Sequence, residues 1–348
     1  MKSSASSSFQ MRMGAKYVYG IAETGTAEPT TDSLTRNNNT APIDATSAEG
    51  QAIGSVGNKM KSFLAENLVG IYKEKVHMLY YRDLAAVVSN MPLAHIQRMK
   101  VDIRSGGKNG ISYILAHQQV VESIRKAGFV ILPVRFGTVG KEVEVRKLLF
   151  EQYNKFKLKI ARFKDKDEIG IRIVSSAAAD RKLSERVQES GEIKRAKLLI
   201  QQQSSHSTGR EGSLYFSNLR LNDLIRNQKF KFIDGITMQV HQKLAMASDA
   251  WSELSKETQQ TIFNRTYLVD RSRADEFNAA IEYVRQNYCM PYEMAIYRSG
   301  PWAPYSFCMD NGPLSFGNTD SVSRNPSQQS NNHGPSQHRY RLVKSNKR

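Results

Sequence analysis

Strand-like and helix-like segments follow one another in a restrictive order between Glu168 and Ser299. Strand patterns lie at 168–174, 250–254, 262–269 and 292–299, and helical patterns at 180–203, 213–246 and 273–287. This order, β-α-β-β-α-β, is that of the ferredoxin-like motif, with its first helix expanded into two helices over 180–246. The longer helix repeats apolar residues from Leu221 to Leu244, which predicts an antiparallel helical hairpin or coiled coil. We therefore expect residues 166–310 to form a modified ferredoxin-like domain.

Residues 15–165 carry the patterns of another α+β domain. Aromatic and β-branched residues predict a strand over Lys16–Ile21, and further strands are expected at 68–72, 76–81 and 129–136. Helical spacing covers 111–127 and the stretch from Lys141 to Phe163. Pro133 removes a ladder donor from the last strand, so that strand should lie at a sheet edge or carry a bulge. The predicted fold class is α+β with two domains, the first a mixed sheet with helices.

Three segments contain too few large apolar residues to contribute to a core. Residues 1–14 are predicted to form a disordered leader, and residues 23–58, rich in Thr, Asn, Ala and Gly, a flexible insertion. Residues 311–348 combine Ser, Asn, Gln, Pro and Gly with six basic residues, which predicts a disordered basic tail.

The chain has a net charge of +17, from 50 Lys and Arg against 33 Asp and Glu. A surplus of this size favours anionic partners such as nucleic acid, acidic proteins or a membrane surface. The longest apolar stretch, Ala127–Val134, is far shorter than the about 20 residues of a spanning helix, so no membrane insertion is expected. The N-terminal residues lack the apolar core of a secretory signal. The only two cysteines, Cys289 and Cys308, have apolar or aromatic neighbours and are expected to be buried thiols in a reducing cytoplasm.

No catalytic, cofactor or metal site is predicted. The chain lacks a nucleophile elbow, an H-E-x-x-H motif, paired C-x-x-C motifs and a Walker A loop, and Gly106–Gly110 is interpreted as a turn. His117, in the centre of a helix, is expected to be half-buried and hydrogen-bonded, and its alternative role is that of a general base in a hydrolase. His333 and His338 lie in the tail among Gly, Pro and Ser, where we expect no bound metal.

A basic RNA-binding module is the alternative function. A ferredoxin-like sheet with positive charge is the outline of an RNA-recognition domain. The aromatic strand signature of those domains is absent from this sequence, which makes nucleic acid an unlikely partner.

Five motifs are more specific than these patterns. They are, in chain order, Tyr17-Val18-Tyr19-Gly20-Ile21; Asp83-Leu84-Ala85-Ala86-Val87-Val88-Ser89; His117-Gln118-Gln119-Val120-Val121-Glu122 followed by Leu132-Pro133-Val134-Arg135-Phe136-Gly137-Thr138-Val139; Arg265-Thr266-Tyr267-Leu268-Val269; and Gly300-Pro301-Trp302-Ala303-Pro304-Tyr305-Ser306-Phe307. In combination they closely resemble the F/L family of gas vesicle proteins, from about Lys16 to Phe307. The sequence departs from the family in the 23–58 insertion, in the basic tail, and in Ala303, where the family often has proline.

The resemblance implies a non-enzymatic accessory protein of gas vesicles, which are gas-filled protein shells that give buoyancy. Family members are regarded as minor vesicle components that assist shell assembly. The resemblance implies as partners the small hydrophobic shell protein and other gas vesicle accessory proteins, with location in the vesicle and the cytoplasm. It also implies two α+β domains, the second a modified ferredoxin-like unit.

Four residues are predicted to contact the partner. Arg135 and Phe136 follow the strand that contains Pro133, and a sheet edge there could cover an exposed strand of the shell protein. Trp302 and Tyr305 lie on a corner stiffened by two prolines and could serve as rigid aromatic contacts. The alternative for each pair is structural: a core strand ending at Gly137, and rings that cover the end of the second domain's core.

Overall fold

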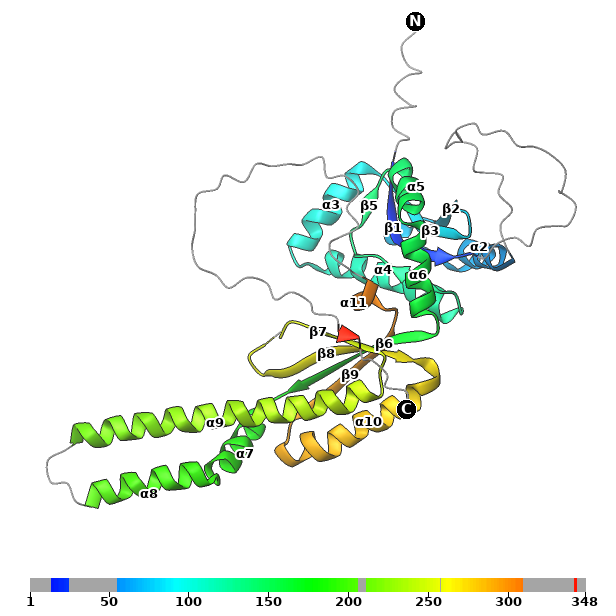
Figure 1. The fold of residues 1–348 in the computed structure, drawn as a ribbon. Helices are drawn as coiled ribbons and strands as arrows, with labels where there is room; N and C mark the ends of the chain where they lie inside the picture. The colour runs from blue at the N-terminus through cyan, green and yellow to red at the C-terminus, as the bar shows by residue number, and fades with distance from the viewer. Residues whose placement is uncertain (1–13, 25–54, 206–210, 257, 309–340, 343–348) are drawn as a thin grey trace, which may run out of the picture. The chain divides into compact units, whose positions relative to one another are not determined.

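The computed structural model describes residues 14–24, 55–205, 211–256, 258–308 and 341–342 (Figure 1). It is a mixed α+β structure with two antiparallel sheets and many helices. The described residues form two compact units. The first contains residues 14–165 together with Trp302–Cys308, and the second contains the residues from Lys166 to Pro301 together with 341–342.

The sheet of the first unit has the strand order β2-β3-β1-β4, and β5 also pairs with β1. Its strands are β1 (Ala15–Glu23), β2 (Val76–Tyr81), β3 (Leu84–Met91), β4 (Ile131–Pro133) and β5 (Val139–Gly140). The β1 strand lies centrally, antiparallel to β3, β4 and β5. The β4 strand lies at the edge of the sheet. An edge strand tolerates Pro133, which has no backbone N–H to donate to a neighbouring strand.

The helices of the first unit are α2 (Ser55–Asn67), η2 (Ile71–Lys73), α3 (Leu93–Arg104), α4 (Lys108–Lys126), α5 (Glu142–Glu151), α6 (Tyr153–Phe163) and α11 (Tyr305–Cys308). The sequence analysis predicts α4 but neither α2 nor α3. Met60 and Leu64 of α2 and Met99 of α3 are buried in the core of this unit. The continuous helix expected from Lys141 to Phe163 is instead two helices separated at Gln152.

The sheet of the second unit has the strand order β10-β7-β8-β6-β9. Its strands are β6 (Lys166–Val174), β7 (Ala250–Glu253), β8 (Thr261–Asp270), β9 (Ala295–Trp302) and β10 (Arg341–Leu342). Its helical segments are α7 (Ala177–Gln188), α8 (Gly191–Ser205), α9 (Glu211–Met246), η3 (Arg271–Arg273), α10 (Ala274–Val284), η4 (Arg285–Cys289) and η5 (Met290–Tyr292). Figure 1 shows α8 and α9 side by side, extending beyond the sheet.

Alternate residues of β6 and β8 make the core of the second unit. Ile169, Ile171 and Ile173 of β6 are buried in one cluster with Phe263 and Tyr267 of β8. The same cluster contains buried residues of α7, α9 and α10, so these helices cover one face of the sheet.

Several predicted boundaries are wrong where the structure describes the chain. Glu23 ends β1 and Ser55–Asn58 begin α2, so both ends of the predicted 23–58 insertion are ordered, while 25–54 lies outside the described residues. Most of the leader and tail also lies outside them, including His333 and His338, but Arg341–Leu342 pairs with β7. Trp302–Cys308, expected in the second domain, belongs to the first unit because it packs there.

Candidate functional site

Motifs that are distant in the sequence meet around His117 in the first unit. The Tyr17 hydroxyl lies 3.0 Å from His117 Nδ1 and accepts a hydrogen bond from the Gly137 backbone N–H, also at 3.0 Å. The His117 ring stacks on Tyr19, with ring centroids 5.6 Å apart, and meets the edge of Phe136 at 5.7 Å. We call Tyr17, Tyr19, His117, Phe136 and Tyr305 the His117 cluster; Tyr305 completes it at 6.2 Å from the imidazole.

Two glycines allow the chain to pass close to this cluster. A Cβ on Gly70 would lie 2.0 Å from the Tyr19 hydroxyl, and that hydroxyl accepts a hydrogen bond from the Ile71 N–H at 2.9 Å. A Cβ on Gly20 would lie 2.7 Å from the Leu132 carbonyl oxygen, which belongs to the neighbouring strand β4. The Tyr-Val-Tyr-Gly motif is therefore explained by packing: two buried rings followed by a residue that lets β4 approach.

Burial controls the protonation of the His117 cluster. Desolvation lowers the pKa of His117 to about 4, against a smaller opposing effect of the Val134 backbone, so the imidazole is neutral near pH 7. Desolvation likewise raises the pKa of Tyr17 and of Tyr19 above the usual tyrosine value. The imidazole is therefore neutral, enclosed by aromatic rings and bonded through Nδ1 to the Tyr17 hydroxyl.

A buried carboxylate holds the aromatic corner against α4. Glu122 Oε1 accepts a hydrogen bond from the Ala303 N–H at 2.8 Å, and Glu122 Oε2 pairs with Arg125 Nε at 2.7 Å. Glu122 and Ala303 are 7% and 0% exposed. The last motif is therefore fixed to the first unit by one charge-assisted hydrogen bond and a small side chain that fits into the core.

The four predicted partner-binding residues lie in different environments. Arg135 is exposed just after β4, whereas the ring of Phe136 is half-buried in the His117 cluster. Tyr305 is also half-buried in that cluster, and Trp302 is half-buried at the end of β9. The structure thus brings Phe136 and Tyr305 together, and Arg135 is the most accessible of the four. Contact of any of them with a partner stays a prediction.

No group of three or more metal-ligating side chains is found within the described ranges. Cys289 is buried, and burial raises the pKa of its thiol to about 11, while Cys308 is partly exposed. No described helix is both long and apolar enough to span a membrane.

The surface of the α8–α9 hairpin is the feature that sequence reasoning missed. Eight large apolar side chains on the two helices are exposed: Leu198, Leu199, Tyr215, Phe216, Leu219, Phe230, Met238 and Met246. The apolar periodicity of α9 predicts one buried stripe, and Ile236, Val240 and Leu244 are indeed buried. Near the tip of the hairpin, α8 and α9 have only each other to pack against. Large apolar side chains on their outer faces therefore remain in solvent.

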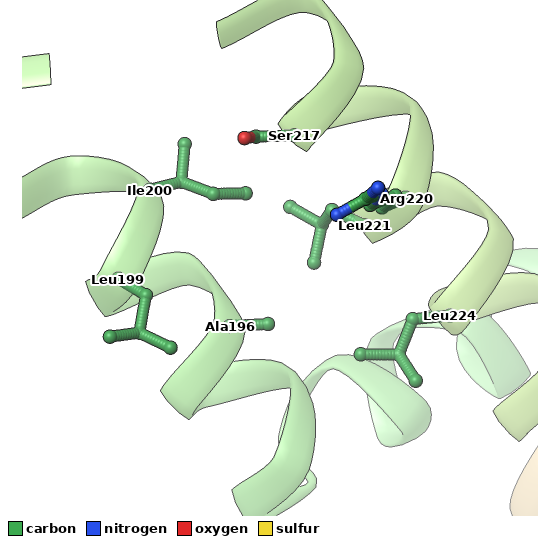
Figure 2. Close-up of a pocket in the computed structure, with 7 residues that line it drawn as sticks. All are labelled: Ala196, Leu199, Ile200, Ser217, Arg220, Leu221 and Leu224. Atoms are coloured by element: carbon green, nitrogen blue, oxygen red, sulfur yellow. The ribbon is translucent and has the colours of Figure 1, made fainter. Parts of the chain in front are cut away.

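A hollow of about 210 Å3 lies between the two helices near the hairpin tip (Figure 2). We call it the α8–α9 groove; Ala196, Leu199 and Ile200 line it from α8, and Ser217, Arg220, Leu221 and Leu224 from α9. Figure 2 shows Ile200 and Leu221 pointing into the space between the helices. Ala196 and Ser217 are too small to fill it, so this part of the hairpin is concave and mainly apolar.

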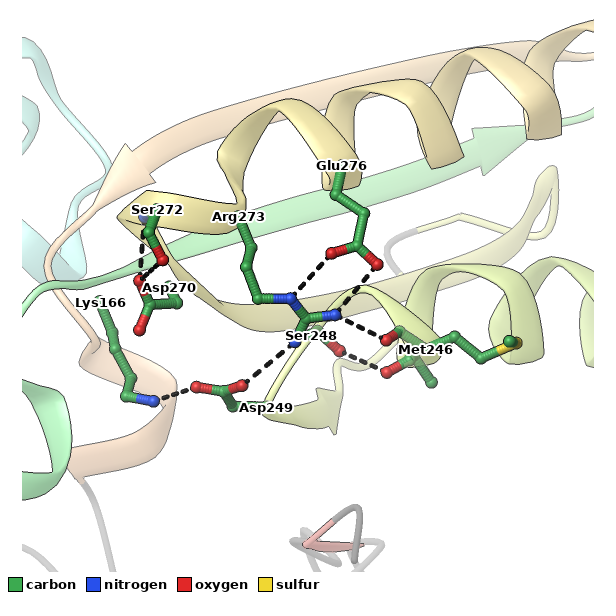
Figure 3. Close-up of polar contacts among 9 residues, drawn as sticks. Lys166, Met246, Ser248, Asp249, Asp270, Ser272, Arg273 and Glu276 are labelled. Carbon is green, nitrogen blue, oxygen red and sulfur yellow. Dashed lines mark hydrogen bonds and ion pairs between the residues drawn. The ribbon is translucent and has the colours of Figure 1, made fainter. Parts of the chain in front are cut away.

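Polar contacts fix the other end of the hairpin (Figure 3). Arg273 Nη2 donates to the Met246 carbonyl at 2.9 Å, at the C-terminal end of α9, and Arg273 Nε pairs with Glu276 at 2.8 Å. Asp249, just after α9, pairs with Lys166 and lies 3.6 Å from Arg273. The base of α9 is thus tied to the start of β6 and to α10, which gives the groove a fixed support.

Comparison with known proteins gives consistent results. The family model described as gas vesicle synthesis protein GvpL/GvpF matches residues 15–309. Gas vesicle protein F of Haloferax mediterranei is 42% identical over 66 residues, which cover 17% of this chain and 30% of that relative. The aligned stretch therefore spans less than a third of the relative's length.

Two crystal structures share the fold. GvpF of Microcystis aeruginosa superposes with a TM-score of 0.52 at 20% identity, covering 85% of this chain and 99% of that one. GvpF of a species of Anabaena superposes with a TM-score of 0.59 at 17% identity, covering 86% and 100%. At this identity the two structures establish the architecture and nothing further.

Proposed function

Because the chain belongs to the GvpL/GvpF family of gas vesicle synthesis proteins, we propose that it is a non-enzymatic accessory protein that assists assembly of the vesicle shell. Its proposed partners are the hydrophobic shell protein and other gas vesicle proteins, in the vesicle and in the cytoplasm where the shell forms. The proposed action is to cover apolar surface of the shell protein reversibly before polymerisation, which requires no catalytic group.

The observation that carries this proposal is the exposed apolar surface of the α8–α9 hairpin. Phe216 and Leu199 are 64% and 60% exposed, although both are large hydrophobic residues. An apolar surface of this extent on one element typically marks an interaction site. The surface gives the protein a place where the apolar segment of another chain could be held out of water.

We also propose that the chain has a first domain over 15–165 and that the second unit is a modified ferredoxin-like domain over residues 166–310, with the helical hairpin over 180–246 as an insertion. In support, the strands β7-β8-β6-β9 have the order that this motif requires, with pairs β6–β8 and β7–β8 antiparallel. Helices α7, α8 and α9 come between β6 and β7 in chain order, the position of the first helix in this motif, which supports the proposal.

The proposal is tested by co-expression with the shell protein in cells. A tagged chain should retain the shell protein on purification, and deletion of the chain should reduce vesicle formation. A Phe216→Ser/Leu199→Ser variant should fold but recover less shell protein, whereas Val143→Ser, an exposed apolar residue of α5, should behave as the parent does. Normal recovery of shell protein by the hairpin variant would show that this surface is not the binding site.

An RNA-binding module is the second candidate, favoured by one feature of the sheet. The guanidinium of Arg172 lies 5.4 Å from the ring centroid of Tyr297, which is 52% exposed. An accessible aromatic ring beside an arginine is the kind of surface on which RNA bases stack. Nuclease-sensitive recovery of RNA, with affinity that falls steeply as salt rises and is lost in Tyr297→Ala, would favour this function.

A further inference from the structure

Two exposed arginines of the hairpin lie at or near the α8–α9 groove: Arg220 lines it, and Arg195 directly precedes the lining residue Ala196. Arg195 precedes Leu199 by four residues on α8, and Arg220 follows Phe216 by four residues on α9. A spacing of four places each pair on one face of its helix. Both arginines are exposed, and neither makes a hydrogen bond or an ion pair with any side chain in the described ranges.

The nearby acidic groups on the hairpin already have partners. The Asp223 carboxylate accepts a hydrogen bond from Arg226 Nη2 at 2.8 Å, and Glu192 accepts one from Gln228 across the two helices. The Gln228 amide is neutral, so Glu192 keeps its charge, but the same described stretch of the hairpin carries Lys194, Arg195, Lys197 and Arg220 and therefore has a positive surplus. Such a surplus attracts acidic groups and disfavours basic ones at the same distance.

The walls of the groove favour a helix as its occupant. Both walls are helices, whose backbone N–H and C=O groups bond within each helix, so an extended segment would find no ladder partners there. A helix satisfies its own backbone and can insert a ridge of apolar side chains between two other helices.

From this geometry we propose that the α8–α9 groove binds an amphipathic helix whose apolar ridge is flanked by acidic residues. The ridge contacts Ile200 and Leu221, and the acidic residues lie against Arg195 and Arg220. This inference rests on the proposed function, because it specifies the kind of segment that a gas vesicle partner presents. An anionic membrane surface is the other partner with suitable charge, but it offers no ridge to enter a concave site.

The test uses the full chain and two synthetic helical peptides of about 18 residues. Both carry the same apolar ridge; one has glutamates and the other lysines at the flanking positions. Fluorescence anisotropy should give an affinity at least tenfold higher for the glutamate peptide, and this difference should shrink as salt rises. Equal affinities for the two peptides would overturn the charge assignment.

Three variants locate the site. Arg195→Glu/Arg220→Glu should reverse the peptide preference, whereas Arg181→Glu/Lys256→Glu makes the same change of charge at exposed residues outside α8 and α9 and should preserve it. Ala196→Phe fills the groove without a change of charge and should weaken binding of the glutamate peptide at least tenfold. Circular dichroism and melting curves identify any variant that fails to fold, and Ala196→Gln then replaces Ala196→Phe as the filling change.

The outcomes separate this inference from the proposed function. Recovery of shell protein from cells without any peptide preference would overturn the helix site and leave the proposed function intact. A strong, groove-dependent peptide preference without recovery of shell protein would overturn the function and leave the site. If the protein binds phosphatidylserine vesicles but neither peptide, and Ala196→Phe leaves vesicle binding unchanged, the partner is a membrane surface. That result would overturn the proposal that the groove binds a helix.

Discussion

The His117 cluster and the α8–α9 groove differ in how their large side chains are used. In the cluster, Tyr17 and Tyr19 are 0% exposed, and each hydroxyl has hydrogen-bond partners. Beside the groove, Leu199 and Phe216 are more than half exposed, on a surface that no described element covers. The cluster is part of a packed core, whereas the groove resembles half of an interface.

The contrast shows what the family motifs encode in this chain. Gly70 lies against the Tyr19 hydroxyl, the Gly137 N–H donates to the Tyr17 hydroxyl, and Gly20 lets β4 approach β1. The Glu122 carboxylate accepts a hydrogen bond from the Ala303 N–H. These requirements are strict because an added Cβ at Gly20 or Gly70 would lie within 2.7 Å of a neighbouring atom, and the other two are direct hydrogen bonds of 3.0 Å or less. The groove needs only apolar residues of suitable spacing, which leave no distinctive motif in the sequence.

The largest difference between the two regions should appear on truncation of one large side chain in each. Tyr17→Ala removes a fully buried ring and should lower the free energy of unfolding by about 3–5 kcal/mol. Phe216→Ser should change it by less than about 0.5 kcal/mol, because the ring is already in solvent. Urea denaturation measures both. Equal losses of stability would contradict the distinction between a core and an open surface.

Acid should destabilise the protein through two histidines whose pKa is lowered by partial or full burial, His241 and His117. The pKa of His117 is lowered to about 4 by burial, against about 6.5 in the unfolded chain, so below pH 6.5 the unfolded chain takes up a proton that the folded protein does not. Stability from this residue is therefore complete above pH 6.5 and falls towards pH 4, in total by about 3 kcal/mol at about 1.4 kcal/mol per pH unit.

A histidine of the second unit should add to the same pH dependence. Burial, with a further effect of Arg265, lowers the pKa of His241 to about 4, so this residue acts in the same direction. His117→Gln should reduce the slope of stability between pH 4.5 and 6.5, and His117→Gln/His241→Gln should flatten it further. Denaturation curves over this range give the slopes. A slope unchanged in the double variant would show that neither imidazole is buried as the structure places it.

An intermediate effect is expected at the carboxylate that holds the aromatic corner. Glu122→Ala leaves the buried Ala303 N–H without its acceptor and should cost about 2 kcal/mol, in the range for hydrogen bonds to charged groups. Glu122→Gln keeps an acceptor and should cost less. Thermal and urea denaturation measure the two losses. If Glu122→Gln costs as much as Glu122→Ala, the ion pair with Arg125 matters more than the bond to the corner.

Much of the secondary structure follows from local patterns, whereas the site depends on contacts that local patterns do not show. Strands β1, β6 and β8 are predictable because their side chains alternate or are nearly all apolar. Helix α2 also has apolar residues at helical spacing, Val56, Met60, Phe63 and Leu64, but it follows a long segment with few large apolar residues, so the start of the helix is not recognised. That α11 belongs to the first unit depends on Glu122, which is 181 residues from Ala303, and no local pattern contains that information.

The groove illustrates a different limit of sequence reasoning. Apolar residues at helical spacing on α9 predict a buried stripe, and the prediction is correct for Val240 and Leu244, which lie against the sheet. For Phe216 and Leu219 the same spacing occurs where only α8 is available as a neighbour. Exposure is therefore set by how far the hairpin extends beyond its sheet, a property of the assembled unit rather than of the periodicity.

The smallest effect on stability is expected at Arg135. This residue directly precedes Phe136 of the His117 cluster, but its side chain is exposed, so it tests whether exposure or position in the sequence decides the effect. Its carbonyl accepts hydrogen bonds from the Thr138 N–H and hydroxyl, which a change of side chain does not remove. Arg135→Ala should therefore change the free energy of unfolding by less than about 0.5 kcal/mol. Recovery of shell protein then decides its role: reduced recovery at unchanged stability would make the end of β4 a second contact, and normal recovery would leave the groove as the proposed binding surface. A large loss of stability would instead place the guanidinium in the core, against the exposure that the structure gives it.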